Sequence, residues 1–472
     1  MPENRQPRPV ESSRIRVFKP QLVLLALCAL NLSFLCGQER KAPSLDLDSL
    51  HVLDAIADSL IAADSLAIEP SSARIDSIYP FIRYAENQLR FYGKDYERSG
   101  YAEFFKAMDE VRQGKNRKIK ILHIGGSHVQ ADVWSGETRR LLREWSRVEG
   151  ERGFVFPQKL ARSNGSPNFL VSYAGRWSHC KNISPTTREP IGLAGVTAST
   201  SDTLARLVIT LVGENHAEFP YPQYRFTRAK IFHQADSASF EVSLDTSVAH
   251  QKLTSAEWGY AEFSFQEPQT RLPLRIRKTA PHQVRFALHG ISLENEAPGF
   301  NYSAVGVNGA TVGAFLRCSL LERHLRLFQP DLVIFSLGVN DSRYVPFIAQ
   351  TYEKNYDALI AIIKAAAPNA AILFTTNSDN FRRRWRVNAN TPIARDVLIR
   401  LAKRHNAAVW DLFNVMGGLG SFKLWRDANL ARRDRVHFNR QGYRLIGKLM
   451  FEAIIDSYET RFGARSAKRS RF

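Results

Sequence analysis

The sequence predicts an α/β protein whose parallel sheet is interrupted by an all-β segment. Short, nearly continuous apolar runs alternate with helical patterns around residue 119 and again after residue 302, as in a parallel sheet covered on both faces. Between about residues 154 and 294, apolar and polar residues alternate instead, and helical spacing is scarce. The length of 472 residues also favours two domains with extensions over a single core.

The N-terminal region has the pattern of a secretory signal. Arg14, Arg16 and Lys19 precede the apolar run 22–36, and Gly37 offers a small residue before a cleavage site. We therefore expect residues 1–37 to be a signal peptide or an N-terminal anchor, with export to a bacterial periplasm or cell envelope. Residues 38–78 are rich in Ala, Ser, Asp and Leu, which predicts a tether with helical tendency.

The first part of the α/β domain is expected over residues 79–153. A helical stretch is predicted from about Tyr79 to Val111. The β-type run that follows ends at Gly125 and Gly126, and a helical pattern resumes over residues 133–148. Ser127 therefore sits on the turn between a strand and a helix, at the sheet edge where such folds place their active sites.

Residues 154–294 are expected to form an inserted β module, either a sandwich or a jelly roll. Segments such as 205–212 and 239–244 alternate in polarity between turn residues. The α/β pattern returns over residues 295–460, and residues 461–472 read as a basic tail. The predicted elements of this second part are the helices 311–328, 352–367, 393–405 and 441–458 and the strands 331–337, 371–376 and 408–412.

Four short motifs stand next to predicted strands or the last helix. They are 125–128 (GGSH), 306–309 (GVNG), 338–341 (GVND) and 434–437 (DRVH). In this order they resemble the four motif blocks of the SGNH hydrolases, the GDSL-like esterases. The resemblance implies a flavodoxin-like three-layer hydrolase domain with a parallel sheet.

The resemblance extends to one branch of that family. His128 directly after the serine, the segment 152–157 (RGFVFP) and the β-rich insertion are similar to the peptidoglycan O-acetylesterase branch. Members of that branch carry a carbohydrate-binding-like module at this place. His128 itself allows two interpretations: it shapes the acyl pocket, or it packs under the turn.

The residue types in these motifs suit acyl transfer. A serine hydroxyl becomes a good nucleophile when a general base accepts its proton, and His437 is the candidate base for Ser127. Asp434 lies three residues before His437, so its carboxylate can orient the imidazole. The alternative is that Asp434 caps the last helix and His437 packs beside it.

An acyl transfer also needs donors for the developing oxyanion. Ser127 precedes a helix, where its backbone N–H is free. By resemblance, the backbone N–H of Gly309 and the side-chain amide of Asn340 complete the hole, although Gly306 lies near Gly309 and either could serve a turn. Gly126 stands where the family usually has aspartate, which is not a triad member.

Charge and cysteines narrow the remaining possibilities. The formal net charge of +19 suggests either a solvated basic surface or attraction to an anionic envelope polymer. The basic residues are scattered and no nucleic-acid motif accompanies them, so we expect no nucleic-acid partner. Cys180 and Cys318 remain after cleavage, either as free thiols or as a disulfide. No Cys/His spacing indicates a metal, and no cofactor is expected.

Two groups of residues raise the question of glycan binding. Five aromatic residues of the insertion form either a sugar-stacking platform or part of the core: Trp177, Tyr221, Tyr224, Trp258 and Tyr260. The segment 382–385 (RRRW) follows a predicted strand on the catalytic side. It either binds an acidic glycan or is a solvated loop.

The leading hypothesis is a secreted serine esterase that removes O-acetyl groups from a carbohydrate, with cell-wall peptidoglycan as the substrate. An O-acyltransferase, or an esterase for another acetylated polysaccharide or lipid, would use the same residues. A catalytically silent envelope glycan-binding protein is the alternative from a different class. Contact with a membrane is expected only through an N-terminal anchor.

Overall fold

The computed structural model describes residues 79–93, 99–186, 189–213, 222–383 and 385–460. At its centre is a six-stranded sheet with the strand order β1-β19-β16-β15-β2-β14. The five strands from β19 to β14 are parallel, and β1 pairs antiparallel with β19 at the edge. Their bounds are β1 Leu89–Phe91, β2 Lys118–Gly125, β14 Gly299–Gly306, β15 Leu332–Ser336, β16 Ala371–Thr375 and β19 Ala408–Trp410. The parallel strands follow the flavodoxin-like order, which confirms the predicted fold class.

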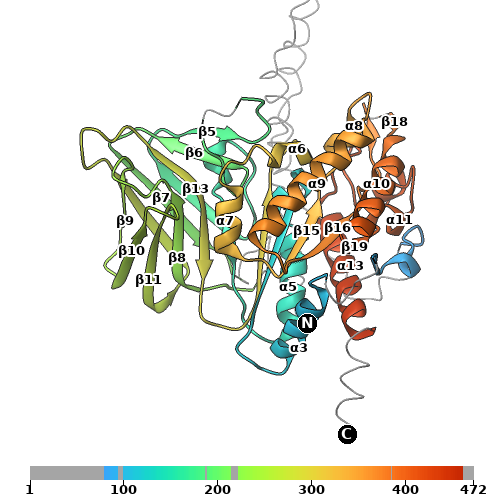
Figure 1. Cartoon of the computed structure of the whole chain (residues 1–472), viewed down its shortest axis with the longest axis horizontal. Coiled ribbons are helices and arrows are strands. Elements are labelled where there is room, and N and C mark those ends of the chain that lie inside the picture. The colour runs from blue at the N-terminus through green and yellow to red at the C-terminus, as the bar shows by residue number, and fades with distance from the viewer. Residues whose placement is uncertain (1–78, 94–98, 187–188, 214–221, 384, 461–472) are drawn as a thin grey trace, which may run out of the picture. The chain divides into compact units, whose positions relative to one another are not determined.

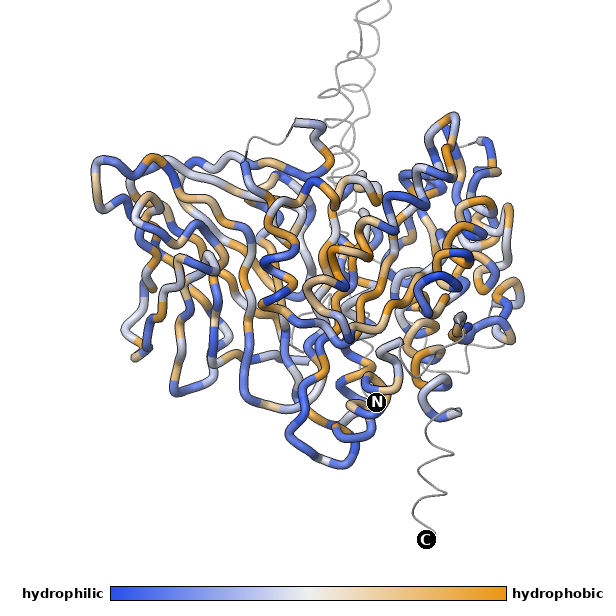
Figure 2. Tube along the Cα trace, in the orientation of Figure 1, coloured by the Kyte–Doolittle hydropathy of each residue, from blue (hydrophilic) through white to orange (hydrophobic). Residues whose placement is uncertain are grey.

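Helices cover both faces of this sheet because its strands are apolar on both sides. Ile121 and Ile334 point to the cluster that contains α3 and α13, whereas their neighbours Leu122 and Val333 point to the cluster that contains α9 and α10. Figure 1 shows the sheet between these layers, and Figure 2 shows the apolar residues gathered along its strands. The long helices are α3 Tyr101–Arg112, α5 Trp134–Ser146, α7 Leu321–Phe328, α9 Ala349–Ala366, α10 Asn390–Arg404 and α13 Arg440–Tyr458.

Short helices follow the carboxyl ends of the parallel strands. They are α4 Ser127–Gln130 after β2, α6 Val312–Phe315 after β14, α8 Val339–Arg343 after β15 and α11 Leu412–Val415 after β19, and α12 Phe422–Asp427 comes later. Three of the sequence motifs thus lie at one edge of the sheet. The fourth, 434–437, directly precedes α13. The topology therefore brings all four motifs to the edge where α/β proteins bind ligands.

An antiparallel module occupies the chain between α5 and β14. Its larger sheet has the order β10-β11-β8-β13-β6-β5 with β3 paired to β13, and its smaller sheet has the order β4-β7-β12-β9. Leu207 of the smaller sheet and Ile231 of the larger one share one apolar cluster, so the module is a sandwich. The strands are β3 Gly153–Val155, β4 Phe169–Ala174, β5 Ser178–Lys181, β6 Val196–Thr200, β7 Leu204–Leu211, β8 Phe226–His233, β9 Glu241–Leu244, β10 His250–Ser255, β11 Tyr260–Gln269, β12 Arg271–Arg277 and β13 Phe286–Glu294.

Two predicted helices were wrong in extent. The stretch 79–111 contains the 3₁₀ turn Tyr84–Glu86 and the strand β1 before α3 begins at Tyr101. The stretch 311–328 is divided into α6 and α7. In the first case, the pairing of Leu89 with Trp410 and of Phe91 with Ala408 fixes an extended backbone that local spacing does not reveal.

Within the described residues, none of the helices is long and apolar enough to cross a membrane. The predicted signal region 1–37, the tether 38–78 and the basic tail 461–472 lie outside the residues that the structure describes.

Candidate active site

Ser127, His437 and Asp434 form one hydrogen-bonded chain. Ser127 is the first residue of α4, and its Oγ lies 2.8 Å from Nε2 of His437. Nδ1 of the same ring lies 2.7 Å from Oδ2 of Asp434. The proximity expected from the motifs is therefore present, in the geometry that lets a histidine accept a serine proton.

Asp434 is held as a carboxylate. Its Oδ1 accepts hydrogen bonds from the backbone N–H groups of Val436 at 2.9 Å and His437 at 3.0 Å. Burial opposes ionisation, but the bonds from His437 and the two backbone groups outweigh it and hold the pKa of Asp434 well below its usual range. Asp434 thus orients the ring and stabilises its own turn. The last helix is capped instead by Asn439, whose side chain accepts from the backbone N of Gly442 at 3.0 Å, so the alternative that Asp434 caps this helix is wrong.

The candidate oxyanion donors lie next to the serine turn, since a Cβ at Gly126 would be 3.3 Å from Nδ2 of Asn340 and 3.6 Å from the carbonyl O of Ala310, which follows Gly309. Asn340, at the second position of α8, donates from Nδ2 to the carbonyl of Ala310 at 3.0 Å. Gly309 is exposed and has a φ of +80°, which only glycine adopts readily. Gly306, by contrast, is buried, and a Cβ there would lie 2.3 Å from the backbone N of Gln130. The structure therefore favours Gly309 over Gly306 as the open donor.

The φ angle at position 126 does not require a glycine. Its φ of −93° is accessible to any residue, and a Cβ would lie 3.3 Å from Nδ2 of Asn340. A side chain at this position would thus press on the Asn340 amide. Glycine instead of aspartate leaves that amide room to remain hydrogen-bonded to Ala310.

His128 packs under the turn. It is buried, its Nδ1 lies 3.0 Å from the hydroxyl of Tyr443, and its ring centroid lies 5.2 Å from that of His437. Burial lowers the pKa of His128 to about 3, so the ring is neutral at physiological pH. The structure supports the packing interpretation of His128.

A polar clamp that the sequence did not predict joins the second motif to the start of the module. Oε1 of Gln130 accepts from the backbone N of Asn308 at 2.7 Å, and Nε2 of Gln130 donates to Ser163 and Asn164. The side chain of Asn308 also donates to Asn164 at 2.9 Å. Because Asn308 precedes Gly309, this clamp fixes the position of a candidate oxyanion donor. No signal in the sequence links residues so far apart in the chain.

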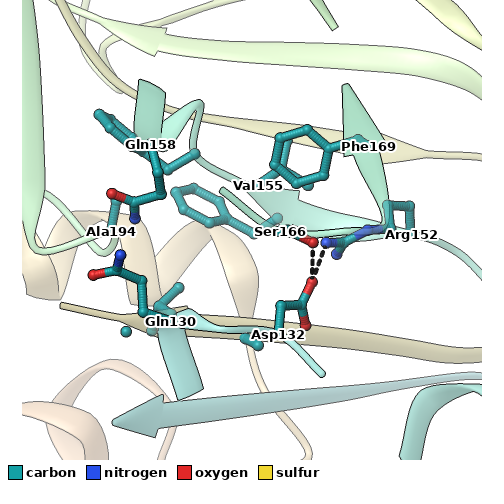
Figure 3. A pocket seen from close by; sticks show the side chains of 13 residues that line it. Gln130, Asp132, Arg152, Val155, Gln158, Ser166, Phe169 and Ala194 are labelled. Carbon is teal, nitrogen blue, oxygen red and sulfur yellow. Dashed lines mark hydrogen bonds and ion pairs between the residues drawn. The ribbon is translucent and has the colours of Figure 1, made fainter. Parts of the chain in front are cut away.

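A small cavity begins at Gln130, the last residue of α4, and is lined by residues of both the α/β domain and the module (Figure 3). Its volume of about 30 Å³ leaves room for about one or two water molecules and is too small for a sugar. Asp132 and Arg152 meet in its wall with Nη2 2.7 Å from Oδ2, and Ser166 donates to the same oxygen at 2.6 Å. Within the described residues, Nε and Nη1 of Arg152 are buried without a partner, which suits ordered water.

The buried Asp132 carboxylate is also contacted by Arg139 of α5 at 3.0 Å and by the amide of Asn168. Burial opposes its ionisation, but the guanidinium groups of Arg139 and Arg152 outweigh burial and lower the pKa of Asp132 to about 2. Asp132 thus ties the helix after the serine turn to the first strands of the module.

The structure also bears on the aromatic residues, the cysteines and the metal ligands considered in the sequence. Tyr224 is buried, and Trp177, Trp258 and Tyr260 are partly buried, so these residues favour the core interpretation; Tyr221 lies outside the described residues. Cys180 and Cys318 are free thiols, not a disulfide. In the described part of the chain, no group of three or more His, Cys, Asp or Glu side chains is placed to hold a metal ion.

Known proteins are similar to this chain in fold and, over part of its length, in sequence. Residues 280–445 match the GDSL-like lipase/acylhydrolase family. No curated protein is significantly similar in sequence. A solved structure of a peptidoglycan O-acetylesterase is 22% identical, with a TM-score of 0.64 over 79% of this chain and 99% of the other.

Smaller proteins resemble only part of the chain. An acetyl xylan esterase, AlAXEase, is 22% identical over 33% of this chain and 81% of its own, with a TM-score of 0.28. The acetylxylan esterase Axe2 from Geobacillus stearothermophilus is 21% identical over 33% of this chain and 73% of its own, with a TM-score of 0.27.

Proposed function

We propose that this protein is a serine ester hydrolase of the SGNH type that removes O-acetyl groups from cell-wall peptidoglycan. Residues 280–445 match the GDSL-like lipase/acylhydrolase family, and the fold is similar to that of a peptidoglycan O-acetylesterase. The observation that carries the proposal is the chain of hydrogen bonds from Ser127 through His437 to Asp434. These three residues supply a nucleophile, its base and the group that orients the base.

The proposed reaction has two halves. His437 takes the proton of Ser127 while Oγ attacks the acetyl carbon, and the oxyanion is stabilised by the N–H groups of Ser127 and Gly309 and by the Asn340 amide. His437 then gives the proton to the sugar oxygen as the ester bond breaks, leaving acetyl-Ser127. Water, activated by His437, attacks this ester and releases acetate and free Ser127.

The substrate assignment rests on similarity of fold. The peptidoglycan O-acetylesterase shares its fold with more of this chain than the α/β domain alone, so the likeness includes the β module. The apolar run 22–36 after basic residues supports export to the periplasm or cell envelope, where peptidoglycan lies. N-terminal sequencing of protein recovered from the periplasm tests this export: a mature chain beginning near residue 38 is expected.

Acetate release tests the function. Wild type, Ser127→Ala and the control Ser247→Ala, an exposed serine of the module, are incubated with O-acetylated peptidoglycan and with a small acetyl ester. We expect Ser127→Ala to lower kcat by about 10⁴-fold or more on both substrates, and the control to match wild type. Equal rates for Ser127→Ala and wild type would refute the esterase. Activity on the small ester without activity on peptidoglycan would refute only the substrate.

A further inference from the structure

Two neighbouring segments that carry exposed side chains lie close to the motifs of Asn340 and His437. One is the end of α8 with the residues after it, up to Ile348; the other is the hairpin β17–β18, made of Phe381–Arg382 and Arg386–Val387. Nδ2 of Asn390 donates to the carbonyl of Ser342 at 2.9 Å, just beyond the hairpin. Figure 1 shows α8 and β18 side by side.

The hairpin also touches the turn that carries the catalytic base. The backbone N of Phe381 donates to the carbonyl of Arg435 at 2.9 Å, and the Arg435 guanidinium lies 5.0 Å from the Phe381 ring centroid. Arg435 stands between Asp434 and His437 in the chain. A molecule bound along the hairpin would therefore lie beside the turn that carries Asp434 and His437.

The surface combines exposed aromatic rings with unpaired arginines. Trp385 is 76% exposed and Tyr344 is 66% exposed. Within the described residues, Arg383, Arg386 and Arg433 form no ion pair, whereas Arg400 and Arg404 on α10 pair with Glu353. The nearby acids Asp341 and Asp434 are engaged with Val312 and His437. We call the set Tyr344, Arg383, Trp385, Arg386 and Arg433 the basic rim; Arg384 lies outside the described residues.

Without a ligand, three features of this surface are energetically unfavourable. Arg382 and Arg386 are directly opposite each other in the hairpin, where like charges repel. Arg383 holds a φ of +48°, which is unfavourable for a side chain of its size. An exposed indole adds apolar surface in contact with water. A bound anion with flat apolar faces would relieve the repulsion and cover the indole.

We propose that the basic rim binds an acidic polysaccharide and presents its acetyl ester to Ser127. The arginines would bind carboxylates of the glycan, and Trp385 and Tyr344 would pack against the apolar faces of its sugar rings. This inference rests on the proposed esterase function and adds a substrate class to it: a glycan whose repeats carry carboxylates on the sugars or on their substituents.

The test compares two polymers that differ in charge. Polygalacturonate and dextran, both acetylated with acetic anhydride, are assayed beside a small acetyl ester. The variants are Arg386→Glu and Trp385→Ala. The controls are Lys115→Glu, an exposed charge before β2 at the opposite edge of the sheet, and Leu253→Ala, an exposed apolar residue of β10.

For Arg386→Glu we expect kcat/KM on acetylated polygalacturonate, divided by kcat/KM on the small ester, to fall about fivefold or more. The same ratio for acetylated dextran should change less than about twofold. Trp385→Ala should lower the ratio for both polymers, since stacking does not depend on charge. Because exposed charges are screened, raising the salt from 50 to 500 mM should lower wild-type activity on polygalacturonate and affect Arg386→Glu less.

The outcomes separate the two proposals. If the wild type releases no acetate from the small ester, the esterase itself fails. If the wild type is active and both rim variants keep the wild-type ratio on polygalacturonate, the esterase stands and the rim proposal is overturned. A rim that binds single-stranded RNA or anionic lipid vesicles but leaves polysaccharide turnover unchanged on substitution would equally overturn it.

Discussion

At the scale of single residues, the two oxygens of Asp434 have separate tasks. Oδ2 accepts from the His437 ring, and Oδ1 accepts from two backbone N–H groups of the same turn. With Nδ1 protonated and bound to Asp434, Nε2 is left without a proton and can accept the one from Ser127. The carboxylate therefore selects the tautomer that the reaction needs.

Asp434→Asn tests this division of tasks. The amide can still accept from the backbone N–H groups, but its NH₂ group would face Nδ1 and favour the wrong tautomer. We expect kcat on the small ester to fall about 10³–10⁴-fold with little change in stability. The matched control is Asp427→Asn, which removes an exposed acid paired with Arg426. A kcat within about threefold of wild type for Asp434→Asn would contradict the role of Asp434.

The sequence motifs predicted which residues form this site, but not the hydrogen bonds that hold those residues in position. Asp434 and His437 are three residues apart, so their contact follows from one turn of chain. The contact between Ser127 and His437 spans 310 residues and could be expected only from the resemblance of all four motifs. The hydrogen bonds among Gln130, Asn308 and Asn164 form only when the α/β domain and the module pack together, so local sequence patterns do not predict them.

At the scale of elements, the end of β14 packs directly on the serine turn. A Cβ at Gly306 would lie 2.3 Å from the backbone N of Gln130 and 2.7 Å from the carbonyl O of Gly126. Both are backbone atoms of the turn that holds Ser127, and they cannot move aside as a side chain can. The position of the nucleophile therefore depends on this close approach of two backbones.

Gly306→Ala should displace α4 and separate Ser127 from His437. We expect a loss of about 1–3 kcal/mol in the free energy of unfolding and a fall in kcat of about tenfold or more. Urea denaturation and small-ester kinetics measure the two effects. Gly165→Ala is the control, because a Cβ there meets nothing within 4 Å. The packing argument is wrong if both substitutions behave alike.

The elements that the sequence predicted well are those with a strong local pattern. The buried strands β15 and β16 and the long helices α9 and α13 coincide with apolar runs or helical spacing of sufficient length. The strand β1 and the hairpin β17–β18 were missed. They contain three and two paired residues per strand, so their conformation is set by the neighbour they pair with and not by their own sequence.

At the scale of the whole molecule, the folded chain contains several neutral, buried histidines. Burial lowers the pKa of His123, His128, His233 and His324 to about 3 and that of His289 to about 4. An unfolded chain would protonate these rings at a pKa near 6.5. Below that pH, the unfolded state therefore binds more protons than the folded state, and acid favours unfolding.

We predict that the free energy of unfolding falls as the pH is lowered from about 6.5 toward 3, by ~1.4 kcal/mol per pH unit for each such histidine. Asp341 acts in the opposite direction, because burial raises its pKa to about 7 and the folded state therefore binds a proton that the unfolded state releases. This single proton does not offset those of the five histidines. Urea midpoints at pH 8, 6.5 and 5 measure the effect: little change is expected between the first two and a clear fall at pH 5. His289→Gln should weaken the dependence. A midpoint that stays constant from pH 6.5 to 5 would refute it.

The Asp132 cluster bears on how this protein can be divided. A carboxylate buried among Arg139, Arg152 and Ser166 takes its donors from both sides of the junction between the α/β domain and the module. Deleting the module would remove the hydrogen bonds that Ser166 and Asn168 donate to Asp132. The buried ion pairs of Asp132 with Arg139 and Arg152 would then be destabilised. We therefore expect the α/β domain and the module to unfold together as one unit. A chimaera with a different module would therefore need hydrogen-bond donors equivalent to Ser166 and Asn168 at the junction.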